Sequence, residues 1–452
     1  MKRIFKTADY DATLDVTVRL GDCLPPDHLA RFVVDTIAHL DLSALYARYG
    51  ARGGSPSAPE ILLALLFYGY ATGVFSSRKI ERATYETIPF RFIASNLHPD
   101  HDTLATLRKT FLPELKDLFV QVLLLAQVAG VLKLGNSSLD GTKIHADASK
   151  SKAVSYKHLL ALEAHLHAEV EELFALSERV DQGELPDGLV VSDEIAIRQA
   201  RLARLAEAKA VLSARASERT ASEQAEYAAK VQERAEKARQ TGRTPRGRVP
   251  KPPTPGVRDK DQYTFTDPES RIMKHSSTEG FEQDYNAQIA VDQASLLIVG
   301  ESLSNHPTDQ RAVEPTLDAI APDLGIPTAA ALDTGYFSEA NIDVFERRGI
   351  DPHSATGRDP HHPSWWERFA PLSAPPSEDA TPKVKMAYKL KTVLGKAISR
   401  LRTCTVEPVI GIMKEGLGFR QFSLRGELAA AGEWCLVCLA FNLKRLHSLL
   451  QG

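Results

Sequence analysis

Through the first 130 residues, apolar positions recur at alternating spacings of three and four, which is the pattern of amphipathic helices. Serine, aspartate and proline stand where helix starts are expected. The segment from Ser57 to Gly73 is apolar on most sides, so we expect it at the centre of a helical region. Other helices are expected after Pro26-Asp27, after Ser76-Ser77, after Pro99-Asp100, and from Leu115 to Leu132.

The pattern then changes to short apolar runs that are typical of strands. Residues 137–144 form the first run, residues 285–292 alternate with a period of two, and residues 296–299 complete a hairpin. The elements expected next are a helix from Thr308 to Ala321, a strand at 329–332, a helix from Ser338 to Arg348 and a strand at 350–354. This order of elements is ribonuclease-H-like, and in such a sheet the first and fourth strands are neighbours.

A helical hairpin is expected to interrupt this sheet after its first strand. From Tyr156 to about Arg239 the chain is rich in Ala, Glu, Arg and Leu, with narrow apolar stripes near heptad spacing. The remaining faces are charged. The hairpin is therefore either a solvated spacer or a seam between two copies of the chain, and the sequence slightly favours the spacer.

A basic, proline-rich segment from Thr241 to Pro253 follows, and its composition excludes helix and sheet. Arg246-Gly247-Arg248 resembles the core of an AT-hook, a motif that lies in the DNA minor groove, but Val249 stands where that motif has proline. A flexible, solvated linker is the favoured interpretation. Such a linker could still contact DNA phosphates without sequence preference.

Together these patterns predict an α/β fold with a ribonuclease-H-like mixed sheet, flanking helices, an N-terminal all-α domain and an α-helical insertion. A chain of 452 residues is long enough for two or three domains. The expected boundaries are 1–130 for the N-terminal helical domain, 131–155 for the first part of the sheet domain, 156–240 for the insertion, 241–260 for the linker and 261–452 for the rest of the sheet domain with C-terminal helices.

Three acids stand at the ends or edges of the expected elements. Asp140 follows a short apolar run and precedes Gly141, a pattern that fits a hairpin turn as well as a catalytic site. Asp333 follows the apolar run 329–332 in the same way, and neighbouring first and fourth strands would bring it beside Asp140. Glu407 lies in a helix-patterned segment. Three carboxylates from separate elements are a suitable ligand set for two divalent metal ions.

The surroundings of Glu407 are less regular, because Pro408 directly follows it. A proline inside a helix costs about 3 kcal/mol, so we expect either a new helix from near Thr405 or a kink at Glu407. Arg402 and Lys414 would frame the acid with positive charge suited to phosphates, or be ordinary surface charge. Glu415 is a competing acid nearby.

Short helices near the N-terminus suit a helix-turn-helix arrangement, in which side chains at one helix start reach a DNA groove. Arg78 and Arg108 stand at positions suited to groove and phosphate contacts. The alternative is a plain helical bundle with both arginines as solvated surface charge. The formal charge of the whole chain is −3, so any DNA binding must come from local clusters.

Composition narrows the remaining possibilities. Four cysteines are too few for a disulfide framework, which favours a reducing compartment. Cys435 and Cys438 have the spacing of half a zinc site, but their apolar neighbours favour buried small side chains. The N-terminus has no apolar signal-peptide region and no run approaches roughly 20 apolar residues. We therefore expect a cytoplasmic protein without membrane contact.

The motifs around the acids are Asp140-Gly141-Thr142-Lys143, Asp333-Thr334-Gly335-Tyr336 and Val406-Glu407-Pro408-Val409 through Lys414, followed by Gly418-Phe419-Arg420 and Leu424-Arg425-Gly426. They look like those of a bacterial insertion-sequence transposase of the DDE class. The resemblance runs nearly end to end, through residues 76–81, 99–101, 285–288 and 304–307. Related transposases often have Tyr seven and Arg four residues before the Glu, where this chain has Arg400 and Thr403, so Arg402 is the candidate substitute.

The resemblance implies an enzyme that binds terminal inverted repeats, cleaves DNA and joins the freed 3'-hydroxyl to target DNA, as a homodimer on paired ends. It implies two Mg²⁺ ions, with Mn²⁺ as a substitute, and Asp140, Asp333 and Glu407 as metal ligands and catalytic residues. The expected DNA contacts are Arg78, Arg108, Lys143, Arg246, Arg248, Arg402 and Lys414. Two alternatives remain: a ribonuclease-H-like nuclease without integration, and an inactive transposase-derived DNA-binding protein.

Overall fold

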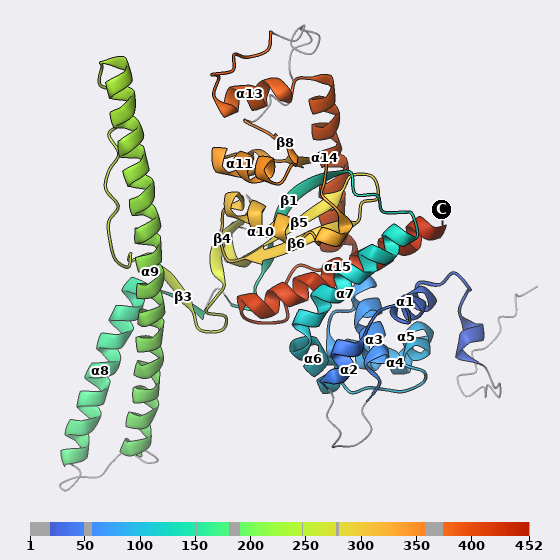
Figure 1. Ribbon diagram of the computed structural model, residues 1–452. Coiled ribbons are helices and arrows are strands. Elements are labelled where there is room, and N and C mark those ends of the chain that lie inside the picture. Colours follow the sequence, from blue (N-terminus) through green and yellow to red (C-terminus); the bar gives the residue numbers. More distant parts are fainter. Residues whose placement is uncertain are drawn as a thin grey trace, which may run out of the picture. The chain divides into compact units, whose positions relative to one another are not determined.

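The structure is a computed structural model that describes residues 19–48, 57–149, 152–179, 190–245, 247–276, 280–357 and 374–451 (Figure 1). The chain forms two compact units. Unit 1 combines Met1–Ile144 with Tyr285–Gly452, and unit 2 is the intervening His145–Asp284. The domain boundaries expected from the sequence remain a prediction.

The N-terminal part of unit 1 is helical, as expected. Its elements are η1 (Leu20–Cys23), α1 (Leu29–Ile37), α2 (Ser43–Ala47), α3 (Pro59–Ala71), α4 (Ser77–Glu86), α5 (Ile88–Ile93), α6 (His101–Thr110) and α7 (Leu112–Val128). Helix α3 is buried on nearly every side, as its apolar composition predicts. The short helices α2 and α5 were not expected, because five or six residues are too few to show a helical period.

The long helix α15 (Glu427–Gln451) packs against α3 and α7, and Figure 1 shows α7 and α15 lying side by side. It also packs against strand β6 (Ile298–Ser304). Asn442 fixes that contact, because its side chain accepts from the Ile298 backbone N–H (2.8 Å) and donates to the Ile298 carbonyl (2.7 Å). Cys435 and Cys438 are buried free thiols on α15, in agreement with the interpretation as small buried side chains.

Arg108 corrects the sequence prediction. Its side chain is buried, donates hydrogen bonds to the Tyr70 hydroxyl (2.9 Å) and the Phe75 carbonyl (3.0 Å), and lies 3.6 Å from a Glu433 oxygen. Glu433 is itself fully buried on α15. Arg108 therefore ties the N-terminal helices to α15 and is not exposed for DNA contact.

The sheet has the strand order β4-β5-β1-β7-β8, with β6 paired to β5. Its strands are β1 (Asn136–His145), β4 (Arg271–Ser276), β5 (Gly280–Asp292), β6, β7 (Ala329–Leu332) and β8 (Asp351–Ser354). β1 and β8 each pair parallel to β7, whereas β6 pairs antiparallel to β5. The ribonuclease-H-like mixed sheet is thus confirmed, with its first and fourth strands, β1 and β7, as neighbours.

Of the two helices expected between these strands, the one at 338–348 follows the prediction and the one at 308–321 does not. α11 (Glu339–Arg347), α13 (Pro382–Lys389) and α14 (Val393–Gly411) are regular, with short turns at η5 (Pro322–Leu324) and η6 (Thr334–Tyr336). The single helix expected at 308–321 is instead η4 (Asp309–Ala312) followed by α10 (Val313–Asp318). Pro315 lies in the first turn of α10, where its missing N–H is tolerated, and so marks a new helix start.

Unit 2 contains the helical hairpin that the sequence predicts. α8 (Tyr156–Arg179) and α9 (Val191–Thr241) pack together. α8 contacts β2 (Ala153–Ser155), and α9 contacts β3 (Gln262–Thr264) near its middle, where Arg215 donates to the Gln262 carbonyl; β2 and β3 form a two-stranded sheet. The core of the unit is formed by Leu159, Leu166, Leu205, Ala208, Leu212 and Tyr263. The expected Leu stripes therefore supply its buried side chains.

The proline-rich segment after α9 has neither helix nor strand between 247 and 258, as predicted. It is held against α9 by side chains of that helix. Arg234 donates to the Gly247 carbonyl (3.2 Å), Arg219 donates to the Gly256 carbonyl (3.1 Å), and Arg258 pairs with Glu223 (2.8 Å). Gly247, Gly256 and Arg258 are nevertheless exposed, as is Arg248, so this segment contacts α9 while it stays open to solvent.

Candidate active site

Asp140 and Asp333 lie at the same level of two neighbouring parallel strands. The register of β1 and β7 pairs Leu139 with Leu332, and each aspartate is the next residue along its chain. Parallel pairing therefore places both carboxylates at one edge of the sheet, as the strand order predicts.

Helix α14 brings Glu407 to the same place because β7 is built from small residues. Ile398 of α14 packs in a cluster with Ala329 and Ala331, whose short side chains allow a close approach of the helix. The Thr405 hydroxyl donates to Ser138 on β1 (2.9 Å). The helix continues through Pro408 to Gly411, so no new helix begins near Thr405.

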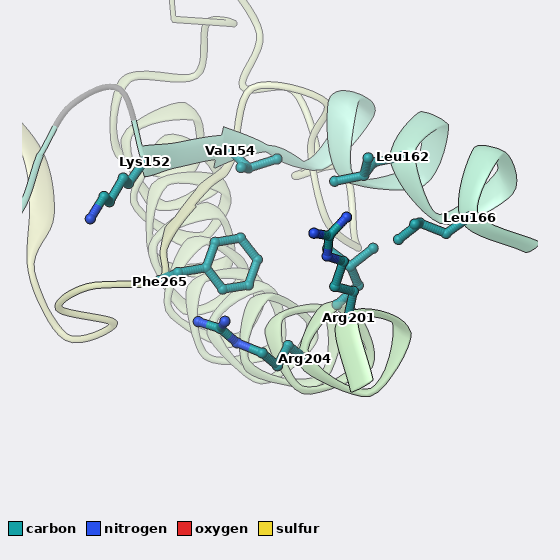
Figure 2. A pocket seen from close by; sticks show the side chains of 8 residues that line it. Lys152, Val154, Leu162, Leu166, Arg201, Arg204 and Phe265 are labelled. Carbon is teal, nitrogen blue, oxygen red and sulfur yellow. The ribbon is translucent and has the colours of Figure 1, made fainter. Parts of the chain in front are cut away.

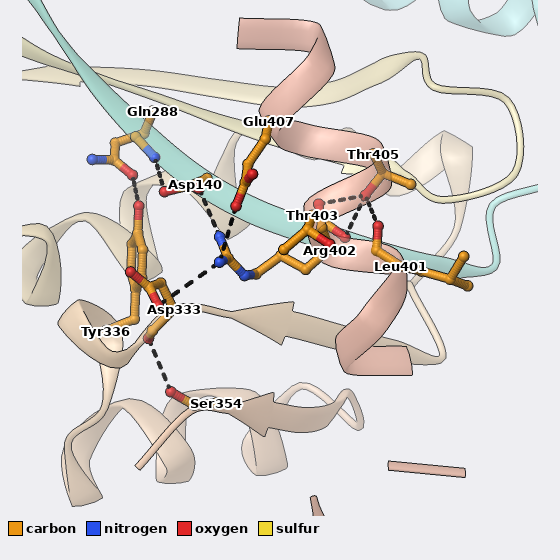
Figure 3. A network of polar contacts seen from close by, with 12 residues as sticks. Asp140, Gln288, Asp333, Tyr336, Ser354, Leu401, Arg402, Thr403, Thr405 and Glu407 are labelled. Carbon is orange, nitrogen blue, oxygen red and sulfur yellow. Dashed lines mark hydrogen bonds and ion pairs between the residues drawn. The ribbon is translucent and has the colours of Figure 1, made fainter. Parts of the chain in front are cut away.

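The guanidinium of Arg402 contacts all three acids (Figure 3). Its Nη1 lies 2.9 Å from Asp140 Oδ2, and its Nη2 lies 3.9 Å from Asp333 Oδ1. Nη2 also lies 3.2 Å from Glu407 Oε1. The structure therefore brings the three acids predicted from the sequence around one cation, which Arg402 provides.

The pKa of Asp140 is raised to about 6, chiefly by burial and to a smaller extent by the nearby carboxylates of Asp333 and Asp309. The Gly141 N–H and the Arg402 guanidinium act in the opposite direction. Asp333 and Glu407 are about half exposed, whereas the Asp140 side chain is 21% exposed. A neighbouring positive charge therefore helps Asp140 to stay ionised.

A fourth acid, Asp309, was missed by the sequence analysis. Its Oδ1 accepts from Asn286 Nδ2 (2.9 Å) and Gln288 Nε2 (3.0 Å) on β5, and pairs with Lys143 Nζ (3.2 Å) on β1. Tyr336 donates to Gln288 Oε1, which extends the network beside Asp140 (Figure 3). The only local signal was that Asp309 closely follows the Ser304–Pro307 motif.

Gly141 is required by a close approach. A β-carbon at this position would lie 2.0 Å from Gln288 Nε2, which is far inside any allowed contact. The Asp-Gly pair in β1 is therefore explained by packing against the amide network and not by a hairpin turn, since β1 continues to His145.

The remaining basic residues expected near the acids are engaged inside the site. Lys143 pairs with Asp309, and Lys414 Nζ donates to the Thr142 hydroxyl (3.2 Å) and the Lys143 carbonyl (3.3 Å). Lys414 lies in a π-helical turn, η7 (Ile412–Gly416), directly after α14. Glu415 pairs with Arg420 and is exposed, so it does not join the acid cluster.

Of the DNA contacts expected farther away, Arg78 is exposed near the start of α4 and Arg248 is exposed beside α9. Arg246 lies outside the described residues. Arg108 is buried and is excluded from that role, as described above.

Unit 2 carries a pocket of about 380 Å³ at the base of its helical hairpin (Figure 2). Leu162, Leu166 and Val154 form an apolar wall, and Arg204 lies 5.4 Å from the Phe265 ring centroid in a cation–π contact. Arg201 and Lys152 add further positive charge. The base of the hairpin is therefore cationic.

The acid cluster fits hard divalent cations in its donor chemistry. Asp140, Asp333 and Glu407 offer only carboxylate oxygens, which Mg²⁺ and Mn²⁺ prefer. The three acids converge on Arg402, and the pKa of Asp140 is raised. Both observations show that positive charge stabilises the ionised carboxylates of this cluster.

A ribonuclease-H-like sheet with one acid within β1, one directly after β7 and one on α14 defines a DDE-type nucleotidyl-transferase fold. Two family models match the chain: Transposase domain (DUF772) over residues 18–110 and Transposase DDE domain over residues 204–443. The second covers more than half of the chain, which belongs to the insertion-sequence DDE transposases. Divalent metal ions are typical of this family. No curated protein and no solved structure was found to match the chain.

The matched range 204–443 includes Asp333 and Glu407 but begins after Asp140. The long insertion between β1 and β5 separates Asp140 from the rest of the domain in sequence. The position of Asp140 in the cluster therefore comes from the sheet register and its contact with Arg402. Among the described residues, no helix is both long and apolar enough to cross a membrane.

Proposed function

We propose that this transposase binds the terminal inverted repeats of its element and catalyses metal-dependent DNA cleavage and strand transfer. The observation that carries the proposal is the convergence of Asp140, Asp333 and Glu407 on one guanidinium. These acids come from three separate elements, and such a convergence needs a large opposing charge. The proposal includes a homodimer on paired ends and a cytoplasmic location.

In this proposal Asp140, Asp333 and Glu407 hold two Mg²⁺ ions. When bound, the ions activate water or a 3'-hydroxyl and stabilise the leaving oxygen of the phosphodiester. Asp140 must be ionised to hold a cation, so the positive charge of Arg402 favours the competent form of Asp140. Arg402, released from the acids, is positioned to contact a DNA phosphate.

The amide network fixes the shape of the site around Asp140. Asn286 and Gln288 donate hydrogen bonds that orient Asp309. Asp309 in turn pairs with the side chain of Lys143, which lies on β1 as Asp140 does. Lys414 donates to the same strand. These contacts hold positive charge beside the acids, where the DNA backbone would lie.

The test is a reaction with purified protein, Mg²⁺ and DNA that carries the element's own ends, scored for cleaved and joined products. Glu407→Gln keeps the size of the side chain and removes its charge, so we expect DNA binding to persist while both products fall by orders of magnitude. Glu415→Gln is the matched control, because Glu415 pairs with Arg420 and lies outside the acid cluster. This variant should form cleaved and joined products at near-normal levels.

The outcomes separate the alternatives. Cleavage without joined product would identify a nuclease, and end binding without either product would identify an inactive transposase-derived protein. Near-normal joining by Glu407→Gln together with an inactive Glu415→Gln would overturn the assignment of the third acid.

A further inference from the structure

A second cluster of metal-ligating side chains lies within unit 2, apart from the three acids. It consists of His145, His275 and Asp284, and their ligand atoms all lie within 4.8 Å of one another. His145 ends β1, His275 is in β4 and Asp284 is in β5, so three strands contribute to it. Nothing in the proposed reaction uses these residues.

Both histidines turn the same nitrogen toward one carboxylate. His145 Nδ1 lies 2.7 Å from Asp284 Oδ1, and His275 Nδ1 lies 3.0 Å from Asp284 Oδ2. The two imidazoles stack with ring centroids 4.3 Å apart. The donor set is therefore two imidazole nitrogens and one carboxylate on a common centre.

The backbone around the cluster fixes this arrangement. The register of β4 with β5 shifts between Lys274 and Ser276, and a bulge of this kind bends a strand and re-aims the side chain at that point, here His275. The Ala146 N–H donates to the Gln283 carbonyl (2.9 Å), which holds the residues next to His145 and Asp284 together.

The charge balance favours a cation at this place. Asp284 is fully buried, and a buried carboxylate needs a positive partner. The two imidazoles stack with centroids 4.3 Å apart beside this one carboxylate, so one nitrogen of each ring can ligate the same divalent ion. Zinc takes histidine nitrogen and aspartate oxygen together, often through three protein ligands.

We propose that His145, His275 and Asp284 bind one divalent transition-metal ion, with Zn²⁺ the best-fitting class. The site differs in chemistry from the acid cluster, because nitrogen ligands select Zn²⁺ over Mg²⁺. His145 and Asp284 are the first and last residues of unit 2, so the ion joins the two points where the chain enters and leaves that unit. Its role is structural, and it does not depend on the proposed reaction.

The experiment uses the untagged full chain with Asp140→Asn, Asp333→Asn and Glu407→Gln, which removes the acid cluster as a competing metal site. The protein is stripped with EDTA and titrated with Co²⁺ as a spectroscopic substitute for Zn²⁺. We expect one Co²⁺ per chain, with visible absorption bands that Zn²⁺ abolishes. Failure of the catalytic proposal leaves this result unchanged, because the acids are already neutralised.

Adding His275→Ala or Asp284→Asn should abolish the bands, while circular dichroism stays the same. His165→Ala is the control, because it removes a histidine that also pairs with a carboxylate, Glu169, but lies on the exposed side of α8 outside the proposed metal site. If the alanine variant unfolds, His275→Gln replaces it, since Gln keeps a polar side chain of similar reach. The proposal is overturned if the parent binds no Co²⁺, or if the bands survive in the His275 and Asp284 variants.

Discussion

Gly141 determines how closely β1 can approach the amide of Gln288. In Gly141→Ala the new methyl group would overlap Gln288 Nε2, forcing that side chain to move away from Tyr336 and Asp309. We expect a loss of about 1–3 kcal/mol in unfolding free energy, as for other overpacked sites, and a marked loss of strand transfer. Chemical denaturation and the joining assay measure the two effects.

Gly411 provides the matched control for that change. It lies at the end of α14 with helical backbone angles, and an added β-carbon there meets no atom within 4 Å. Gly411→Ala should be neutral or slightly stabilising, because Ala favours helix over Gly. Equal effects at both positions would mean that the contact with Gln288 does not limit the residue at 141.

Glu301 makes stability depend on pH. It is buried on β6, and burial raises its pKa to about 7, although Lys116 and a hydrogen bond with Cys435 oppose the shift. A carboxyl whose pKa is higher in the folded state stabilises the fold below pH 4.5, its ordinary pKa, and loses that contribution as pH rises to about 7. The contribution lost is about 3 kcal/mol.

Glu301→Gln should remove this dependence, because glutamine stays neutral. The stability of the variant should equal that of the parent near pH 4.5 and should be higher than that of the parent at pH 8. The difference between their urea unfolding midpoints measures this. Glu339→Gln, at an exposed position in the first turn of α11, is the control. A parallel pH profile for parent and Glu301→Gln would contradict the prediction.

Sequence reasoning located Asp140 and Asp333 because each follows a short apolar run, and that pattern is local. It missed Asp309 because that residue begins the short 3-10 helix η4, whose four residues are too few for a period to reveal which way a side chain points. Arg108 was misjudged for a related reason. Its burial depends on Glu433, which lies 325 residues later in the chain and has no signal near Arg108.

At the scale of elements, the distal part of the α8–α9 hairpin can be separated from its base. The described core of unit 2 uses Leu159, Leu166 and Leu205, so replacing residues 170–200 with a short Gly-Ser turn leaves that cluster intact. We expect the helical circular dichroism signal, per remaining helical residue, to be unchanged. Assembly on paired DNA ends should be weaker, as measured by native gels. Unaltered assembly would support the alternative in which the hairpin is a spacer.

Regular elements were predictable because their periods extend over many residues. The strands β1, β5 and β7 and the long helices of the hairpin all appear where the pattern places them. For α14 the sequence allowed either a new helix from near Thr405 or a kink at Glu407, and the helix is continuous from Val393 to Gly411 with Pro408 inside it, which excludes the new start. Packing on the alanine-rich strand β7 stabilises a helix that local propensity alone disfavours.

At the scale of the whole molecule, DNA binding is best tested without deleting the N-terminal helices. They share a core with α15, and Arg108 and Tyr70 contact the buried Glu433, so removing residues 1–130 would expose that core. Arg78→Ala in the full chain changes an exposed residue instead. We expect weaker binding to the terminal repeat and a salt-dependence slope reduced by about one.

Arg347→Ala, at the end of α11, is the control for loss of a surface arginine. Footprinting at several salt concentrations distinguishes the two variants. If Arg78→Ala binds the repeat with the affinity and salt slope of the parent, the assignment of α4 to DNA contact is wrong.

The pairing of the first and fourth expected strands, β1 and β7, was predictable from the order of elements along the chain, since few topologies accommodate that order, whereas strand β4 was not expected. The docking of α15 on the N-terminal helices was not predictable. An apolar helix face shows that a partner exists but does not identify it, and here the partner is hundreds of residues away.

The contact between α3 and α15 also has a consequence for how the protein is made. About 360 residues separate the end of α3 at Ala71 from the start of α15 at Glu427. At roughly 5–20 residues per second, a ribosome needs on the order of 20–70 s to synthesise the missing partner. During that interval the apolar surface of α3 is incompletely covered, so nascent chains should depend on chaperones and prematurely terminated chains should aggregate.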